Sequence, residues 1–191
     1  MHDQRIAEYQ KKYEHHHQLF QQAHLLHHRL GMARLAAMLV ALVLCYYAYN
    51  SQQTAMWVAV GACVAAFVLL VQKQRKVAAE RRLQQELSRV NEEEAAYLRE
   101  GKLSCADGAA YRDDTHAFSA DLDIFGTRSL YQHVNRTATQ MGRDALAHSF
   151  TTLNDQDTIA ARQAAVAELA GEAEQRHLFY AHARLVNDEK Q

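Results

Sequence analysis

Histidine is unusually dense near the N-terminus. Six of the fourteen residues from 15 to 28 are histidines: His15, His16, His17, His24, His27 and His28. His24 and His28 are four residues apart, so on a helix they share one face and can hold a divalent metal ion. A stable zinc site normally has three or four protein ligands in a fixed geometry, and the sequence fixes no further ligand here. The pattern therefore favours a polar helix whose charge rises near about pH 6, with His24 and His28 as weak metal candidates.

Other residue types with reactive chemistry are scattered. Asp113 and Asp114 are adjacent in a polar loop, where neighbouring carboxylates usually point apart and no nucleophile accompanies them. The three cysteines, Cys45, Cys63 and Cys105, form no CxxC pair, which argues against a disulfide framework or a thiolate zinc site. We therefore expect no catalytic residue, no cofactor and no enzyme activity within these residues.

Composition predicts a helical protein. The 191 residues include no proline and seven glycines, which favours long helices and excludes a turn-rich β-sandwich. The 21 Lys and Arg nearly balance the 22 Asp and Glu, which excludes an extended basic nucleic-acid arm and a disordered acidic tail.

Two uncharged apolar runs, Leu35 to Tyr49 and Ala55 to Val71, predict a transmembrane helical hairpin within residues 34–71. They hold 15 and 17 residues, close to the roughly 17 that a bilayer span needs. Gly61 and Ala65 are spaced for close backbone approach in lipid. Tyrosines and Trp57 flank the short link between the runs, and Lys and Arg flank their other ends. The positive-inside rule then predicts an inner (cytoplasmic) membrane protein with both termini in the cytoplasm. The alternative is a buried soluble hairpin, although both runs are apolar on every face.

The flanking segments predict two long helices. Residues 1–33 form a polar, His-rich juxtamembrane helix with a thin apolar seam, interrupted by His16 and His27. Residues 72–100 continue the second span as a coiled-coil-like cytoplasmic helix, and the two helices pair antiparallel. Residues 101–117 form a linker.

Residues 118–191 predict short helices separated by turns. Leu122, Ile124 and Phe125 are expected to be buried in a short extended or turn segment, and Ser129 and Thr139 to cap the next two helices. The helix that Thr139 caps is expected to face the core through four residues: Met141, Ala145, Leu146 and Phe150. A longer helix with Ile159, Val166 and Leu169 on one side breaks at Gly171.

Several motifs in this region occur in a fixed order: Phe118-Ser-Ala-Asp-Leu-Asp-Ile-Phe-Gly126, Ser129-Leu-Tyr-Gln-His-Val-Asn-Arg-Thr-Ala-Thr139, Gly142-Arg143 with Leu146, and Ile159 followed by Arg162-Gln163-Ala-Ala-Val166 and Leu169. This order resembles the start of the core (lever) domain of the MutS family, and in particular bacterial MutS-like proteins with a membrane hairpin ahead of that domain. The resemblance covers about residues 116–170.

The resemblance implies that residues 118–191 are an incomplete helical-bundle core domain. Full-length members of the family bind mismatched or branched DNA and hydrolyse ATP with Mg²⁺ as homodimers. This chain has no G-x-x-x-x-G-K-[ST] phosphate loop, since Gly101-Lys102 lacks the upstream glycine and the hydroxyl residue. We therefore expect DNA binding and ATP hydrolysis to lie in sequence outside these residues.

The motif residues are expected to have structural roles: Asp121, Asp123, Phe125, Gly126, Asn135, Arg136, Thr137, Thr139, Gly142, Arg143, Arg162 and Gln163. The Asn135–Thr139 turn can satisfy helix ends. Arg143, Arg162 and Gln163 can tie neighbouring helices by hydrogen bonds. The alternative is phosphate contact through Arg136 and Arg143, which no basic stripe supports.

The sequence thus predicts a membrane-anchored N-terminal portion of a MutS-like protein of the DNA mismatch-repair type, which serves as anchor and conformational lever. The alternative function is a membrane adaptor or scaffold that binds a protein partner without DNA. A second alternative is a metal or pH sensor built from residues 15–28.

Overall fold

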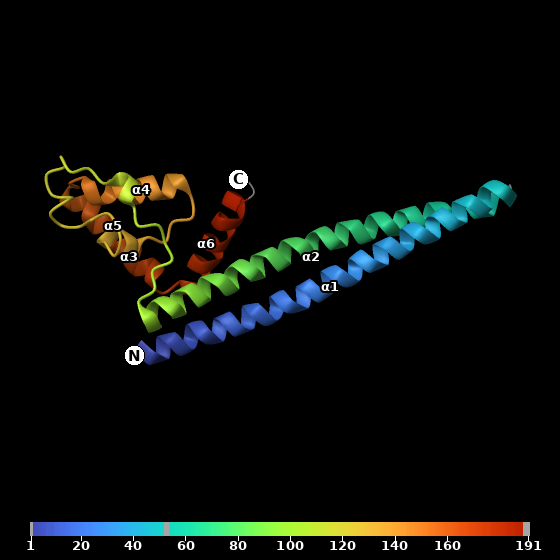
Figure 1. Ribbon diagram of the computed structural model, residues 1–191, viewed down its shortest axis with the longest axis horizontal. Helices are drawn as coiled ribbons and strands as arrows, with labels where there is room; N and C mark the ends of the chain where they lie inside the picture. The colour runs from blue at the N-terminus through green and yellow to red at the C-terminus, as the bar shows by residue number, and fades with distance from the viewer. Residues whose placement is uncertain (1, 52–53, 189–191) are drawn as a thin grey trace. The chain divides into compact units, whose positions relative to one another are not determined.

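The computed structural model describes residues 2–51 and 54–188. Every regular element in this part of the chain is helical (Figure 1): α1 (His2–Ser51), α2 (Thr54–Glu100), the 3-10 helix η1 (Ala109–Tyr111), α3 (Leu130–Val134), α4 (Gln140–Thr151), α5 (Gln156–Ala170) and α6 (Ala173–Asp188). The predicted all-α class is therefore confirmed for the described residues.

The chain divides into two compact units. The stalk unit is His15–Gln85, and the domain unit joins Met1–Glu14 to Glu86–Gln191. Helices α1 and α2 pass without interruption through the boundaries expected at residues 33 and 71. The separate roles assigned to residues 1–33, 34–71, 72–100 and 101–117 stay predictions.

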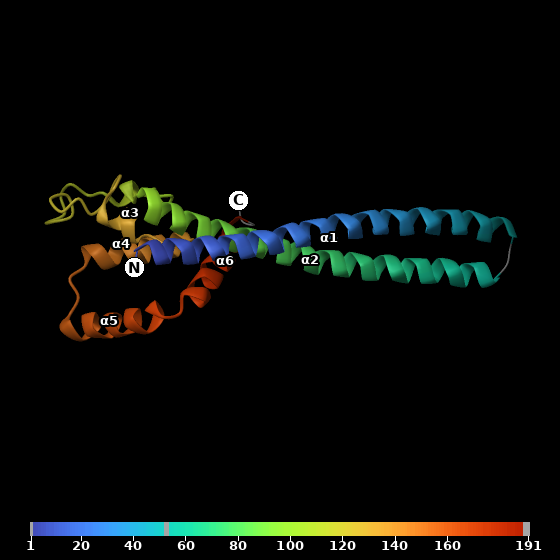
Figure 2. The same ribbon diagram turned by 90° about the horizontal axis from the view of Figure 1, so that it is seen from below.

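Within the stalk unit, α1 and α2 lie side by side in both views (Figures 1 and 2). The covered positions of α1 follow the alternating spacing of three and four residues that is typical of a coiled coil: Phe20, Ala23, His27 and Leu30, preceded by His16. The sequence predicts that His16 and His27 interrupt the apolar seam, and both are half-buried at seam positions. His16 Nδ1 is 2.7 Å from Gln84 Oε1, and His27 Nε2 is 3.4 Å from Gln74 Nε2.

The two apolar runs are largely uncovered. Only 6% of the most apolar window of α1 and 0% of that of α2 is buried inside the structure. A core helix of a soluble protein can be equally long and apolar, but it is mostly buried. By length and composition, both helices are able to cross a membrane.

The small residues predicted to allow close approach do not face the partner helix. Gly61 and Ala65 are exposed, and a Cβ atom added to Gly61 would have no heavy atom within 4 Å. The covered side of α1 carries alanine instead: Ala48 is fully buried, and Ala37 and Ala41 are half-buried. Within the stalk unit, therefore, the covered small residues are these alanines of α1 together with Ala59 and Cys63 of α2, which are half-buried.

The domain unit has a small aromatic core. Its buried residues are Ile124, Phe125, Tyr131 and Ala147, with Tyr111, Phe118, Leu146 and Phe150 packed against them. Burial of Ile124 and Phe125 is confirmed, but Leu122 is 64% exposed. The chain turns at this point, because Ile124 N donates to Ser119 O and Asp123 adopts a left-handed φ of 47°. The turn directs Leu122 away from the core.

Side-chain caps begin the short helices as predicted. Ser129 Oγ accepts a hydrogen bond from Gln132 N at 3.3 Å, and Thr139 Oγ1 accepts one from Gly142 N at 3.1 Å. The predicted core face of α4 is partly wrong, because Met141 is 80% exposed, Ala145 is also exposed and Ala147 is buried instead. Local capping thus sets where α4 begins, whereas packing against α3 sets which face it buries.

Helix α5 has no buried residue. Its expected apolar side, formed by Ile159, Val166 and Leu169, is exposed to 45%, 68% and 52%. Gly171 ends the helix as predicted, since it is the C-cap. An apolar row of this kind is left open to solvent in the described part of the chain.

Gly108 provides a stability test of the aromatic core. Its φ is +71°, and a Cβ atom there would lie 2.6 Å from Cδ1 of the fully buried Tyr131. We expect Gly108→Ala to lower the free energy of unfolding by about 2–4 kcal/mol, because left-handed strain and overpacking add. The measurement is urea unfolding of the purified chain, followed by near-ultraviolet circular dichroism.

Gly101→Ala is the matched control. Gly101 also has a left-handed φ, +67°, but no heavy atom lies within 4 Å of an added Cβ. Only the backbone strain of about 1 kcal/mol remains. Equal losses in the two variants would show that Tyr131 does not restrict position 108.

Candidate functional site

The motif turn between α3 and α4 is built around a buried asparagine. Asn135 is 1% exposed and uses both ends of its amide. Its Nδ2 donates to Ala106 O at 2.9 Å, and its Oδ1 accepts from Thr137 N and Thr137 Oγ1 at 2.9 and 2.7 Å. A buried amide satisfied in this way fixes the turn to the linker, because losing one partner leaves a buried polar group unpaired.

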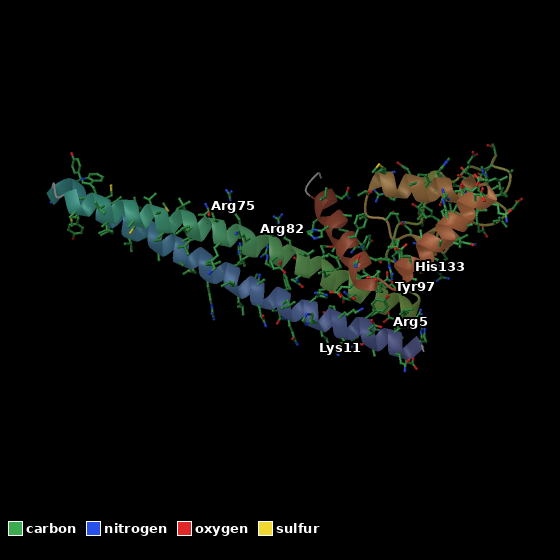
Figure 3. The ribbon with its side chains drawn as sticks, turned by 180° about the vertical axis from the view of Figure 1, so that it is seen from behind. Arg5, Lys11, Arg75, Arg82, Tyr97 and His133 are labelled. Atoms are coloured by element: carbon green, nitrogen blue, oxygen red, sulfur yellow. The ribbon has the colours of Figure 1, made fainter. Side chains whose placement is uncertain are left out.

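Arg136 connects this turn to α2. Its guanidinium makes a two-point ion pair with Glu94, with Nε on Oε1 and Nη2 on Oε2 at 3.3 Å. It also lies 5.2 Å from the centre of the Tyr97 ring and donates to the carbonyls of His133 and Asn135. Tyr97 Oη is 3.2 Å from His133 Nδ1, and Figure 3 shows these two residues next to each other.

Burial alone would lower the pKa of Arg136. The hydrogen bond and the charge of Glu94 outweigh burial and raise the pKa above its ordinary value. The side chains of Arg136 and Glu94 are 33% and 20% exposed, so the pair is only partly screened by water. Phosphate contact by Arg136, the alternative considered from sequence, would therefore compete with an existing carboxylate.

Arg184 makes the second connection to α2, from α6. Its Nη2 is 2.6 Å from Glu93 Oε2, and its Nη1 is 3.7 Å from Glu86 Oε2. The guanidinium also lies 4.6 Å from the centre of the Tyr180 ring. Burial raises the pKa of Tyr180, while the Arg184 charge opposes the rise. One stretch of α2 thus holds both the motif turn and α6 through carboxylates.

Sequence reasoning did not identify this second connection. Glu86 and Glu93 are seven residues apart, so they share one helical face, and that spacing was the available signal. Arg184 lies between apolar residues near the end of the described chain, and no local pattern around it indicates which carboxylates it binds.

Two cavities adjoin the connections. One of about 760 Å³ is lined by the motif turn, by Val90 and Glu94 of α2, and by α6; one of about 220 Å³ contains the Glu86–Arg184 contact. Polar groups on the larger wall are already engaged, since Arg176 donates to the carbonyls of Leu169 and Ala170. The arrangement is suited to holding helices together.

The remaining motif residues are spread over the domain unit. Gly142 lies close to the side chain of the capping residue Thr139, since a Cβ atom added to Gly142 would be 3.2 Å from Thr139 Oγ1. Gly126 has a φ of +115° and donates to Asp107 O. The Arg143 side chain bonds to Gln140 of its own helix, and only its main-chain carbonyl contacts another helix, by accepting from Tyr131 Oη of α3. The last four are exposed: Asp121, Asp123, Arg162 and Gln163. The predicted ties from Arg162 and Gln163 to neighbouring helices are absent from the described residues.

A tyrosine and a carboxylate join η1 to α4. Tyr111 Oη donates to Asp144 Oδ1 at 2.6 Å, and Gln140 Nε2 donates to the same oxygen at 2.7 Å. The Tyr111 hydroxyl, and then Gln140, lower the pKa of Asp144. The pKa of Tyr111 is raised by burial and then by Asp144. The carboxylate therefore stays ionised and holds the start of α4 against the aromatic core.

His24 and His28 are both exposed on α1. Among residues 2–51 and 54–188, no group of three or more His, Cys, Asp or Glu side chains is arranged to hold a metal ion. His24 lies 6.0 Å from Phe20, measured between ring centres. The weak metal assignment stays a prediction.

A double-mutant cycle tests the connection through Arg136. We expect Arg136→Gln and Glu94→Gln to show a coupling free energy of about 1–2 kcal/mol, since the pair is partly buried and makes two hydrogen bonds. The measurement is the free energy of urea unfolding for the wild type, both single variants and the double variant.

The control cycle uses Arg99 and Glu100 on the same helix, an ion pair whose side chains are 54% and 55% exposed. Their coupling should not exceed about 0.5 kcal/mol. A coupling for Arg136 and Glu94 no larger than the control value would contradict the proposed connection.

Comparison with known proteins adds no relative. No family model, curated protein or solved structure matches the chain. The resemblance of residues 116–170 to the MutS core domain therefore rests on the motif residues alone.

Proposed function

We propose that this chain is a membrane anchor and a conformational lever. The observation that carries the proposal is the continuity of α2, which runs from Thr54 to Glu100. The apolar run Ala55–Val71 occupies one end of this helix, and the carboxylates that bind Arg136 and Arg184 occupy the other. A helix resists bending and stretching, so a change at its carboxylate end can alter the hairpin.

Membrane insertion is supported by surface chemistry. Large apolar side chains cover the outside of both runs, including Leu42 at 58% and Val58 at 74% exposure. In water such a surface would be costly, whereas hydrocarbon removes the cost. Tyr46, Tyr47 and Trp57 are exposed near the link, where interfacial aromatic rings are expected. With Lys and Arg at the opposite ends, we place the protein in the cytoplasmic membrane with both termini in the cytoplasm.

The resemblance to MutS proteins suggests what the lever serves. In this proposal residues 118–191 are the beginning of a core domain, and a DNA-dependent ATPase that uses ATP and Mg²⁺ lies in sequence outside these residues. The partners are then the membrane, a second copy of the protein and DNA. The contacts of Asn135 and Arg136 support the lever, because they fix the motif turn to the linker and to α2.

Topology can be tested with single cysteines. In a background with Cys45, Cys63 and Cys105 replaced by alanine, Asn50→Cys places a thiol beside the link, and Thr115→Cys places one in the domain unit. We expect a membrane-impermeant maleimide to label position 50 in intact spheroplasts and position 115 only after lysis. Labelling at both positions before lysis, or recovery of the chain in the soluble fraction, would contradict the hairpin anchor.

The adaptor alternative is favoured by one observation, the exposed apolar row of α5 that contains Ile159, Val166 and Leu169. Such a row can pack against a protein partner. The two functions differ in DNA binding. A MutS-like protein, extracted intact from the membrane, should bind branched DNA with an affinity that falls steeply as salt rises from about 50 to 200 mM. Binding that is absent at about 50 mM salt favours the adaptor.

A further inference from the structure

Five basic residues surround the ends of the apolar runs opposite the link. Arg29 and Arg34 precede the first run on α1, and Lys73, Arg75 and Lys76 follow the second on α2. We call these residues the basic collar. All five are exposed and belong to the stalk unit. Figure 3 shows Arg75 projecting outward from α2.

The basic collar lacks the acidic residues that would neutralise it. The stalk segments next to the runs, residues 15–34 and 72–85, contain a single carboxylate, Glu80. Glu80 accepts a hydrogen bond from Gln84, which follows it in α2, whereas Lys73, Arg75 and Lys76 precede it. No carboxylate in the described chain pairs with any collar residue. Exposed positive charges of this density, with no carboxylate paired to them, attract anionic groups from outside the chain.

The position of the collar relative to the bilayer indicates which anionic groups it meets. At a rise of about 1.5 Å per residue, Lys73, Arg75 and Lys76 lie about 3–8 Å beyond the end of the second run. The polar layer of a bilayer is about 5–7 Å thick on each side of the hydrocarbon. Lys and Arg side chains are long enough to reach phosphates from these positions. The collar thus falls at the level of the headgroups.

We propose that the basic collar binds the phosphate headgroups of anionic phospholipids and enriches them around the hairpin. The inference rests on the membrane insertion proposed above and adds a lipid preference to it. Nucleic acid is a less suitable partner, because a duplex would have to approach within the headgroup layer. Electrostatic attraction between collar and headgroup falls off within about 8–10 Å at physiological salt.

The test measures lipid selectivity of the whole chain in proteoliposomes. Electron spin resonance with spin-labelled phosphatidylglycerol or phosphatidylcholine gives the fraction of each lipid immobilised by the protein, and hence their relative association constant. For the wild type we expect phosphatidylglycerol to be favoured about twofold or more at low salt, and the preference to fall in about 0.5 M NaCl. Orientation of the chain does not affect the result, because both leaflets have the same composition.

The test variant is Lys73→Gln/Arg75→Gln/Lys76→Gln, which should lower the ratio toward one, because only Arg29 and Arg34 of the collar remain. Its matched control, Arg5→Gln/Lys11→Gln/Arg99→Gln, removes the same charge at exposed sites remote from the runs in sequence. Arg5 and Lys11 lie on α1 (Figure 3). The control should keep the ratio of the wild type. Glutamine preserves helix propensity in both variants.

Three outcomes would overturn the lipid preference. A wild-type ratio of one, or a test variant that keeps the wild-type ratio, shows that the collar does not select lipid. Salt-sensitive binding of a DNA duplex to chain in pure phosphatidylcholine, lost in the test variant, assigns the collar to nucleic acid instead. Absence of any immobilised lipid shows that the chain is not inserted, and then the proposed anchor fails together with the lipid preference.

Discussion

The domain unit depends on carboxylates of α2 that are buried or half-buried. Glu86, Glu93 and Glu94 lie on one stretch of the helix, and water would solvate them far better than a protein interior does. Burial is tolerated because two guanidiniums lie against them, Arg136 from the motif turn and Arg184 from α6. Removing Arg136 would take away the partner of Glu94, whereas Glu93 would keep its ion pair with Arg89 if Arg184 were removed. Charge therefore contributes to the packing of the turn and of α6 on α2. The aromatic core is small, which makes these ion pairs more important to the position of α6.

In the stalk unit, polar side chains fix the register in which α1 and α2 pair. A seam of leucine alone would pair α1 and α2 equally well in several registers. His16 with Gln84 and His27 with Gln74 form hydrogen bonds only when the helices are aligned as observed. A slip by one heptad would separate these buried and half-buried groups from the partners they have here, as it does for a single polar seam residue in coiled coils. Register therefore comes from the residues that interrupt the apolar pattern.

Local signals in the sequence predicted most of the helices. Ser129, Thr139 and Gly171 act within a few residues of themselves, so the ends that they define could be found without knowing the fold. Leu122 and Met141 were expected in the core, yet both are exposed, because a turn and a helix rotation that depend on distant packing decide their direction. Arg184 was missed for the same reason. Its partners are about ninety residues earlier in the chain, and no local pattern connects them.

The residues of α2 that directly follow the apolar run are basic, and its carboxylates come mostly later. If the acidic residues alternated with Lys73, Arg75 and Lys76, ion pairs three or four residues apart would neutralise both sets within the helix. The basic residues follow the apolar run instead. Only Glu80 lies within four residues of them, and Glu86 and Glu92–Glu94 come later. The early part of α2 therefore keeps its positive charge for the membrane surface. In the later part, Glu94 pairs with Arg136, and Glu93 pairs both with Arg184 and with Arg89 of the same helix. An anionic surface attracts the first set and repels the second, so one helix can hold the hairpin at the membrane and leave its carboxylate end to the domain.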